Sequence, residues 1–370
     1  MRKILVTGGA GFIGSHLIDR LVKDGKSVVV LDNFDPQVHQ GKKPDYLNKG
    51  AEYIEGDIRD ESALRKAFKD VDIVFHMAAK VGVGQSMYEI KEYVAANTYG
   101  TAFLWDYIIN KKIPVKKFIA ASSMSIYGEG AYKCSKCGIQ APCLRNEEDL
   151  RKKRWEVLCP QCGLELKPIN TFEDKKLLST SVYAITKKDQ EELSLNIGMS
   201  YKIPTVALRF FNVYGPRQSL SNPYTGACAI FSSRIKNNNP PLIYEDGMQT
   251  RDFVYVTDVV EACLLAMSSG KCDYGYFNVG TGNAATINKV AETLVKLYGK
   301  NFPLNVTNQY RVGDIRHCYA DITKLKNAGY KPKVSLKEGL GELVEWGRSA
   351  EAKDLTAKAD LELERRHLKL

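Results

Sequence analysis

The fold is decided by residues 3–14, which read KILVTGGAGFIG. Residues 3–7 are mostly apolar and predict a buried first strand, while residues 15–24 show the pattern of a helix. Between them, Gly9, Gly11 and Gly14 have the spacing G-x-G-x-x-G. Glycines in this context allow a tight turn and let a pyrophosphate approach the backbone at a helix N-terminus. The stretch therefore predicts the strand, turn and helix that open a dinucleotide-binding fold.

The rest of the N-terminal half repeats the alternation of strand and helix. Apolar runs predict strands at residues 27–31, 52–54, 73–76, 117–121 and 205–209, with helical patterns at 61–69, 89–110 and 182–200. Apolar strands that alternate with helices indicate the α/β class and a doubly wound parallel sheet, the Rossmann architecture.

The same patterns divide the chain into four parts. We assign residues 1–133 and 170–215 to the Rossmann domain, to which segments of 251–280 (252–268 and 276–279) return. Residues 134–169 form an insertion with paired cysteines. Residues 216–348 become irregular and rich in Asn, Pro and Gly, which suits a smaller C-terminal domain that binds the substrate. Residues 349–370 predict a charged, exposed helix or a frayed tail.

One acidic residue at the end of the second strand indicates which dinucleotide binds. Asp32 lies 18 residues after Gly14. A carboxylate there accepts a hydrogen bond from a ribose 2′-OH and repels a 2′-phosphate, so NAD is favoured over NADP. Asp57 and Ile58 follow the third predicted strand and either flank the adenine or form a simple turn at the strand end.

Composition excludes several classes of protein. The chain has 370 residues, 44% of them hydrophobic, and a formal net charge of +10. No apolar run approaches the roughly 20 residues that span a bilayer, and the first strand begins too early to leave room for a signal peptide. We therefore expect a cytoplasmic protein with no membrane partner. Scattered, solvated lysines explain the charge, and no alternation of basic and aromatic residues indicates a nucleic-acid partner.

The insertion carries two C-x-x-C-G knuckles. They are Cys134-Ser-Lys-Cys137-Gly138 and Cys159-Pro-Gln-Cys162-Gly163, separated by 21 residues. Each knuckle presents two thiolates, and four thiolates make a closed tetrahedral Zn²⁺ site of the zinc-ribbon kind, which is structural and not catalytic. The alternative is four free thiols. A zinc ribbon on a basic chain also leaves a nucleic-acid-binding protein as a distant alternative.

A tyrosine and a lysine at helical spacing are candidate catalytic residues. Tyr183 and Lys187 are four residues apart and share a helix face. A neighbouring ammonium is expected to favour the phenolate of a tyrosine, whose ordinary pKa is about 10. Ser123 ends an apolar strand, where open α/β sheets bind ligands, and either hydrogen-bonds a reacting hydroxyl or belongs to a serine-rich turn.

These motifs occur in an order that resembles a known family. Together with His76-Met-Ala-Ala79, Asn97 and the stretch 209–217 (RFFNVYGPR), they resemble the extended short-chain dehydrogenase/reductases that act on sugar nucleotides. The resemblance covers residues 1–346 apart from the insertion. It implies that Ser123, Tyr183 and Lys187 form the catalytic triad and that NAD is tightly bound. It also implies a homodimer formed through helices around 93–110 and 183–199.

The resemblance implies a binding role for further residues. For NAD these are Gly8, Gly11, Phe12, Ile13, Gly14, Asp32, Asn33, Asp57, Ile58, Ala78, Asn97, Tyr183 and Lys187. For the substrate, a dTDP- or UDP-linked sugar, they are Val83, Ser125, Asn212 (diphosphate), Arg217, Tyr244 (base), Arg251 and Arg311 (phosphates), Asp314 (ribose) and Cys318.

The residues after Ser123 bear on the reaction. In this family the first step is hydride transfer from sugar C4 to NAD, and Tyr183 would take the hydroxyl proton. The 4,6-dehydratases of the family have Asp and Glu next, and the decarboxylases keep a Glu; here Met124 and Ser125 stand instead. A reductase would favour NADPH, which Asp32 disfavours. The resemblance therefore favours 4-epimerisation, with a 4,6-dehydratase or 4-reductase as the alternative.

Two features of the sequence bear on the identity of the substrate sugar, and they favour different sugars. The stretches 81–88, 123–130 and 218–226 are most similar to the group of dTDP-L-rhamnose 4-epimerases. Cys318 stands where UDP-hexose 4-epimerases have a gatekeeper residue, and a small residue there admits an N-acetyl group. A UDP-N-acetylhexosamine or UDP-hexose substrate therefore stays open beside the rhamnose-like one.

Overall fold

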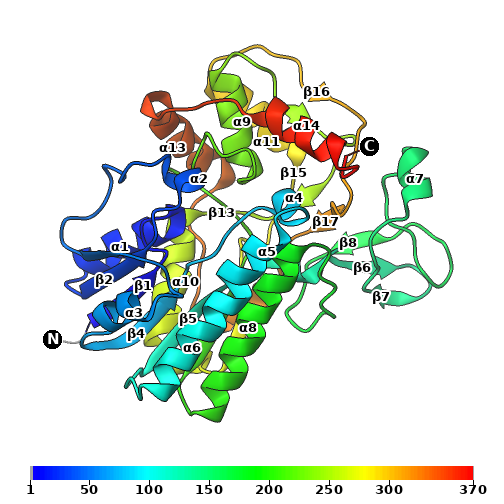
Figure 1. Cartoon of the computed structure of the whole chain (residues 1–370). Helices are drawn as coiled ribbons and strands as arrows, with labels where there is room; N and C mark the ends of the chain where they lie inside the picture. The colour runs from blue at the N-terminus through cyan, green and yellow to red at the C-terminus, as the bar shows by residue number, and fades with distance from the viewer. Residues whose placement is uncertain (1–2, 370) are drawn as a thin grey trace.

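The computed structural model describes residues 3–369. Residues 1, 2 and 370, at the ends of the predicted first domain and tail, lie outside the described residues. A seven-stranded parallel sheet forms the centre of the molecule (Figure 1). Its strands, in spatial order, are β14 (Gly275–Val279), β9 (Thr205–Phe210), β5 (Lys117–Ser123), β4 (Val71–His76), β1 (Lys3–Thr7), β2 (Ser27–Asp32) and β3 (Glu52–Glu55). The predicted doubly wound parallel sheet is confirmed.

Both faces of this sheet are buried at its centre because the central strands are apolar at most positions. In β1, Ile4 and Val6 contribute to one hydrophobic core and Leu5 to the other, as the two-residue period of a strand requires. The first core is covered by α1 (Phe12–Lys23), α10 (Val256–Ser268) and α12 (Thr323–Ala328). The second is covered by α3 (Glu61–Ala67), α6 (Gly100–Asn110) and α8 (Val182–Ser200).

The helix predicted over 89–110 forms, with one irregular turn. It runs as α5 (Ile90–Tyr93), a π-helical turn at Val94–Tyr99 and α6. A π-helical turn inserts an extra residue into the helix and changes which side chains face inward. Here it buries Asn97 completely.

The C-terminal half of the chain forms a second group of elements beside the central sheet. Three helices, α9 (Ala227–Lys236), α11 (Ile287–Leu297) and α13 (Leu336–Ser349), enclose a third hydrophobic core. The sequence between 216 and 348 was expected to be irregular, and it is more regular than expected because these helices bury apolar faces against one another. The short strands pair in three small sheets: β10 (Asn212–Tyr214) with β13 (Phe253–Tyr255); β11 (Leu242–Ile243) with β16 (Asn305–Val306); and β12 (Thr250–Arg251) with β15 (Ala285–Thr286) and β17 (His317–Cys318).

The cysteine insertion protrudes from the body, at the right of Figure 1. It contains β6 (Ala131–Cys134), β7 (Gly138–Gln140), β8 (Lys167–Ile169) and α7 (Glu147–Arg151), and its three strands form an antiparallel sheet. The remaining short elements are α2 (Pro36–His39), α4 (Val83–Ser86) and the 3₁₀ turns at Met124–Tyr127 and Gly270–Cys272. Among residues 3–369, no helix is long and apolar enough to cross a membrane.

The C-terminal tail forms a helix that is only partly exposed. This helix, α14 (Thr356–Arg365), lies above α4 in Figure 1, close to the chain end. Ala359 and Leu363 are 7% and 4% exposed, so one face of α14 is buried against the body. The expectation of an exposed or frayed tail therefore holds for its outer face only.

Candidate active site

A cleft of about 730 Å³ runs between the carboxyl ends of the central strands and the second group of elements. This is where open parallel sheets bind ligands. The predicted site residues that line it are Gly8, Gly11, Phe12, Ile13, Gly14, Asp32, Asn33, Asp57, Ile58, Ala78, Val83, Ser123, Ser125, Tyr183, Lys187, Asn212, Arg217, Tyr244, Arg251, Arg311 and Asp314. Asn97 and Cys318 do not line it.

The glycine turn has the shape that a pyrophosphate requires. Gly8 has a φ of +68°, and a Cβ on it would lie 2.7 Å from the Ala78 backbone. A Cβ on Gly14 would lie 2.6 Å from the carbonyl oxygen of Gly8. The helix α1 then begins with no side-chain cap, so its first backbone N–H groups and its dipole are available to an anion. The residues present therefore fit NAD.

The Asp32 carboxylate accepts two backbone hydrogen bonds, one of them from the glycine turn. Its Oδ2 accepts from the Ala10 amide and its Oδ1 from the Phe34 amide, both at 2.9 Å. Burial raises the pKa of Asp32, while these amide hydrogen bonds lower it. The carboxylate thus stands at the end of β2 and lines the cleft, as the sequence predicted. His39 Nε2 lies 3.9 Å from Oδ1, a neighbour that the sequence pattern did not indicate.

The candidate catalytic residues meet where β5 ends and α8 begins. Ser181 caps α8 by accepting from the Ala184 amide, and the Tyr183 amide donates to Ser86 Oγ at 3.0 Å. Lys187 Nζ donates to the Ala121 carbonyl oxygen at 2.7 Å and to Gln190 Oε1 at 2.8 Å. These bonds fix the first turns of α8 against the sheet.

Burial, not the lysine charge, determines the proton affinity of the tyrosine. Burial raises the pKa of Tyr183 to about 12, and a hydrogen bond with Ser123 lowers it in part. Burial lowers the pKa of Lys187 to about 7. The expectation that the ammonium favours the phenolate is therefore wrong for this structure, because both groups are removed from water and the amine is engaged by Ala121 and Gln190.

Two predicted residues act from behind the cleft. Asn97 Oδ1 accepts from the Lys80 amide at 2.7 Å, and its Nδ2 donates to the Lys80 carbonyl oxygen and to Thr186 Oγ1, both at 3.0 Å. It therefore positions the loop after β4. Cys318 is 1% exposed, and its Sγ lies 3.7 Å from Thr171 Oγ1. Its side chain therefore does not line the cleft directly.

Unpaired polar atoms mark the substrate part of the cleft. Asn212 Oδ1, Arg217 Nη1 and Gln218 Oε1 are buried without a hydrogen-bond partner among the described residues. Buried polar groups are nearly always satisfied, so these atoms indicate a polar ligand. Arg217 is also a partner of Asp19, at 2.7 Å.

Three predicted nucleotide contacts lie together at the far end. The Arg311 guanidinium lies 4.5 Å from the ring centroid of Tyr244, and its Nε donates to Asp314 Oδ2 at 2.9 Å. Arg251 lies nearby and is oriented by backbone carbonyls, with Nη2 donating to Ile315 at 2.6 Å. Guanidinium groups held in this way suit phosphate.

Sequence reasoning missed the contribution of the C-terminal tail. Thr356, Ala359, Asp360, Leu363 and Leu368 all line the cleft. The sequence does contain a pattern that predicts this buried face. Leu355, Ala359 and Leu363 recur at a spacing of four and give α14 an apolar stripe.

The four predicted metal-ligating cysteines lie together in the insertion. The sulfur atoms of Cys134, Cys137, Cys159 and Cys162 are all within 4.8 Å of one another. In a tetrahedral zinc site, Zn–S bonds of about 2.3 Å place the sulfurs about 3.8 Å apart. The donor set and its spacing therefore fit zinc.

Comparison with known proteins identifies the family of the chain. Residues 4–146 and 164–280 match the NAD dependent epimerase/dehydratase family. A dTDP-L-rhamnose 4-epimerase of Burkholderia thailandensis is 36% identical over 93% of this chain and 94% of its own length.

Solved structures of nucleotide-sugar 4-epimerases are also similar to the chain. The UDP-glucose 4-epimerase of Thermotoga maritima with UDP-glucose has a TM-score of 0.77 and 34% identity, covering 94% of this chain and 98% of that one. The UDP-glucuronic acid 4-epimerase of Bacillus cereus, in complex with UDP-glucuronic acid and NAD, has a TM-score of 0.77 and 31% identity, covering 94% and 99%. The chain therefore belongs to the NAD-dependent epimerase/dehydratase family, and nucleotide-sugar 4-epimerases, which are isomerases that use NAD, are among its close relatives.

Proposed function

We propose that the protein is an NAD-dependent nucleotide-sugar 4-epimerase that oxidises C4 to a 4-keto intermediate and returns the hydride to the opposite face. The observation that carries this proposal is the composition of the cleft at the triad. Ser123, Tyr183 and Lys187 line it together, and the residues after Ser123 are Met124 and Ser125. Neither is a carboxylic acid, so elimination of water has no acid next to the triad.

The chain's own residues supply proton transfer and orientation. NAD, when bound, supplies the acceptor and donor of the hydride. Tyr183 removes the proton of the C4 hydroxyl, and its raised pKa makes it a strong base that is seldom ionised at neutral pH. Ser123 lies within hydrogen-bond reach of Ser125 Oγ, at 3.0 Å, and is oriented by that bond towards the reacting oxygen. Lys187 keeps the first turns of α8 fixed through Ala121 and Gln190, and it lines the cleft where it would hold the cofactor ribose.

The charges in the cleft favour a neutral sugar. Most of its basic groups already have acidic or carbonyl partners, and Arg217 keeps a buried Nη1 unpaired among the described residues. The pairs are Arg59 with Asp57, Lys80 with Glu89, Lys187 with Ala121, Arg217 with Asp19, Arg251 with Ile315, and Arg311 with Asp314. A uronic acid would place a carboxylate near the triad, where Lys187 Nζ is already engaged by the Ala121 carbonyl oxygen and by Gln190 Oε1. A rhamnose-like sugar on dTDP is the first candidate, because the similar protein of Burkholderia thailandensis is a dTDP-L-rhamnose 4-epimerase. A UDP-hexose or UDP-N-acetylhexosamine is the second candidate.

A substrate panel tests the proposal. Purified protein would be incubated, with no added cofactor, with dTDP-L-rhamnose, UDP-glucose, UDP-N-acetylglucosamine and UDP-glucuronic acid separately, and products followed by NMR. We expect conversion of dTDP-L-rhamnose to its C4 epimer, because NAD stays bound. Loss of water or net reduction would contradict epimerisation and support the dehydratase or reductase alternative. Conversion of UDP-glucuronic acid alone would refute the neutral-sugar argument.

We further propose that the four cysteines hold a structural Zn²⁺ and that the insertion braces the nucleotide end of the cleft. The support is a buried set of charges that joins the two. Arg145 and Glu156 of the insertion contact Glu245 and Arg316, which flank Tyr244 and Ile315. Arg145 Nη2 also donates to the Asp314 carbonyl oxygen at 3.1 Å. Metal analysis should give one zinc per chain, and Cys162→Ser should lower that content, whereas Cys143→Ser should not.

The proposed homodimer uses the helices on one face of the sheet. In Figure 1, α6 and α8 run side by side at the front of the molecule. Their surroundings expose large apolar side chains, with Tyr99 at 55%, Ile185 at 49% and Val94 at 41%. Sedimentation of the parent and of Ile185→Glu tests this, since a dimer should dissociate in the variant.

The nine cysteines are all unpaired, which suits the reducing cytoplasm as the proposed location.

A further inference from the structure

The C-terminal strap, residues 354–369, has one face turned into the cleft. Ala359 and Leu363 are four residues apart on α14 and are both buried, whereas Leu361 is 47% exposed. Asp360 and Leu368 line the cleft beside them. The strap is therefore part of the wall of the cleft, although nothing in the proposed chemistry uses it.

On one side, the strap is joined to the residues at the nucleotide end. The Val312 amide donates to the Leu368 carbonyl oxygen at 3.0 Å, and Arg311 and Lys369 form an antiparallel bridge. Tyr244 donates its hydroxyl proton to Asp360, whose other oxygen accepts from Lys369 Nζ at 2.9 Å. The tyrosine and arginine assigned to the base and phosphates are thus both in contact with the strap.

On the other side, the strap reaches the loop that follows β4. A Cβ built on Gly84 would lie 3.4 Å from Leu363 Cδ2, so the leucine side chain faces Gly84 with little space between them. The Arg366 guanidinium lies 4.3 Å from the ring centroid of Tyr88. This loop belongs to the NAD-binding half and carries Val83, so the strap bridges the two walls of the cleft.

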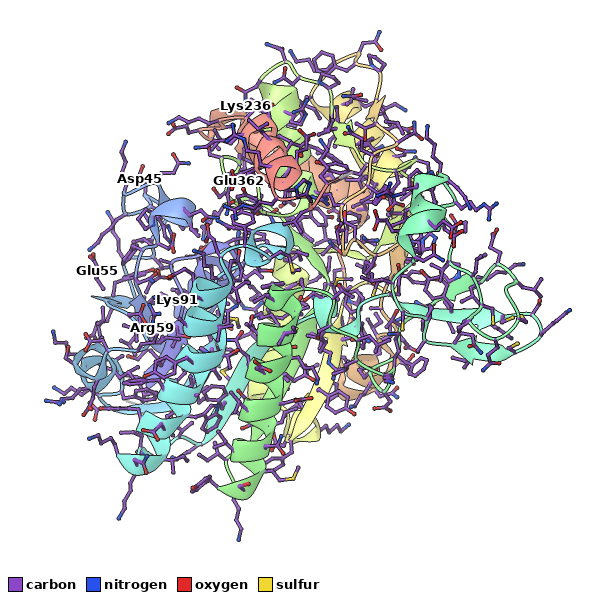
Figure 2. All side chains as sticks on the ribbon, turned by 45° about the vertical axis from the view of Figure 1, so that its right-hand side comes forward. Asp45, Glu55, Arg59, Lys91, Lys236 and Glu362 are labelled. Atoms are coloured by element: carbon purple, nitrogen blue, oxygen red, sulfur yellow. The ribbon has the colours of Figure 1, made fainter. Side chains whose placement is uncertain are left out.

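The strap is held differently along its length. Its start is hydrogen-bonded to α9 and the following loop: Asp354 pairs with Arg234 at 3.3 Å and accepts from Asn239 at 2.8 Å. Just before it, Lys236 donates to the carbonyl oxygens of Gly347 and Ala350. Figure 2 labels Lys236 at this anchored start and Glu362 towards the far end of α14. Between this anchored start and the hydrogen bond of Leu368 with Val312, α14 meets the loop after β4 through van der Waals and cation–π contacts, which break more easily than the hydrogen bonds at either end.

We propose that the strap closes over the nucleoside diphosphate part of the bound substrate, and that substrate enters and leaves when α14 lifts from Gly84 and Tyr88. Leu363 then contacts the ligand directly, and Asp360 holds Tyr244 in its binding position. This inference rests on the proposed function for the identity of the ligand. It adds that residues beyond 350 determine how tightly and how fast the nucleotide end is held.

Paired substitutions on the same helix test the strap. Leu363→Ala and Arg366→Ala remove the contacts with the loop after β4, whereas Leu361→Ala and Arg365→Ala change exposed neighbours. Binding of UDP and of dTDP would be measured by titration calorimetry, and KM and kcat with the nucleotide sugar that reacts. We expect Kd and KM to rise at least fivefold in the first pair, with the loss in kcat/KM coming mainly from KM, and no change in the second pair.

Hydrogen exchange gives a second readout that a purely structural role would not change. In the parent chain, UDP or dTDP should slow amide exchange in residues 355–369, whereas NAD alone should not. Unchanged Kd and KM in Leu363→Ala, or no slowing in 355–369, would overturn the strap. A protein that binds these nucleotides with a protected strap but converts no sugar would support the strap and contradict the 4-epimerase proposal. Normal epimerisation with an unaffected Leu363→Ala would do the reverse.

Discussion

Arg145 and Glu245 form a bidentate ion pair, with Nη1 to Oε2 at 2.8 Å and Nη2 to Oε1 at 2.7 Å. Their side chains are 3% and 2% exposed, so the pair is removed from water. One residue comes from the cysteine insertion and the other directly follows Tyr244. The insertion therefore contacts the second wall of the cleft through an ion pair. Water cannot reach this pair to solvate either charge if the other is removed.

Breaking this pair should affect both stability and substrate binding. Removing one partner of a buried ion pair costs about 3–5 kcal/mol, because the other charge stays buried. We expect Arg145→Met to lower the free energy of unfolding by about that amount and to raise KM. Urea unfolding and steady-state kinetics check this. Arg151→Met, which breaks an exposed pair with Glu147 on the same insertion, is the control and should change neither.

Tyr183→Phe should abolish turnover without loss of the fold. General-base catalysis contributes a factor of about 100 to 10,000, so kcat should fall by that much. The phenyl ring keeps the packing against Tyr93, whose ring centroid lies 6.4 Å away. Turnover by NMR and NAD content after denaturation are the measurements. Tyr201→Phe, an exposed position beyond α8, serves as the control; near-normal turnover of Tyr183→Phe would remove its catalytic role.

The buried lysine should make stability depend on pH. Burial lowers the pKa of Lys187 from its ordinary 10.5 to about 7. Between these values the unfolded chain binds more protons than the folded chain, so stability rises with pH across that window. In the NAD-free protein, thermal or urea unfolding at pH 7 and pH 9 should show a gain of about 1–2 kcal/mol that Lys187→Met lacks. Lys188→Met, at the half-buried neighbouring position that pairs with Glu192, should retain the gain.

Asp32 should govern the choice of cofactor. Asp32→Ala removes the carboxylate that repels a 2′-phosphate, so NAD affinity should fall about tenfold and the preference for NAD over NADP should narrow. Reconstitution of the NAD-free variant with each dinucleotide measures both effects. Asp45→Asn changes an exposed carboxylate on the neighbouring loop (Figure 2) and should leave cofactor choice unaltered. An unchanged preference in Asp32→Ala would show that another group excludes NADP.

The sequence predicted those elements whose structure is determined by residues close together in the chain. The helix at 182–200 has the predicted bounds because its cap at Ser181 and its i, i+4 pattern are written locally. The glycine turn and the cysteine cluster are predictable for the same reason. Placement of Cys318 behind the cleft was not, since it depends on contact with Thr171, 147 residues away.

The direction of the Tyr183 pKa shift was missed for a related reason. A lysine at i+4 is visible in the sequence, but the depth at which both groups are buried is not. The Arg145–Glu245 pair spans 100 residues, and the strap reaches the cleft only because α9 anchors residues 350–354. Such contacts follow from the assembled fold and leave no periodic signal.

The edge position of β14 has a consequence for how the chain is made. β9 pairs with β5 on one side and with β14 on the other, and β14 consists of residues 275–279. During synthesis the chain therefore emerges with β9 unpaired along one edge until some 65 further residues have left the ribosome, and unpaired edges invite association with other chains. The central sheet is complete only after residues 275–279 have been made, so truncation near residue 215 should leave the edge of β9 exposed and favour aggregation.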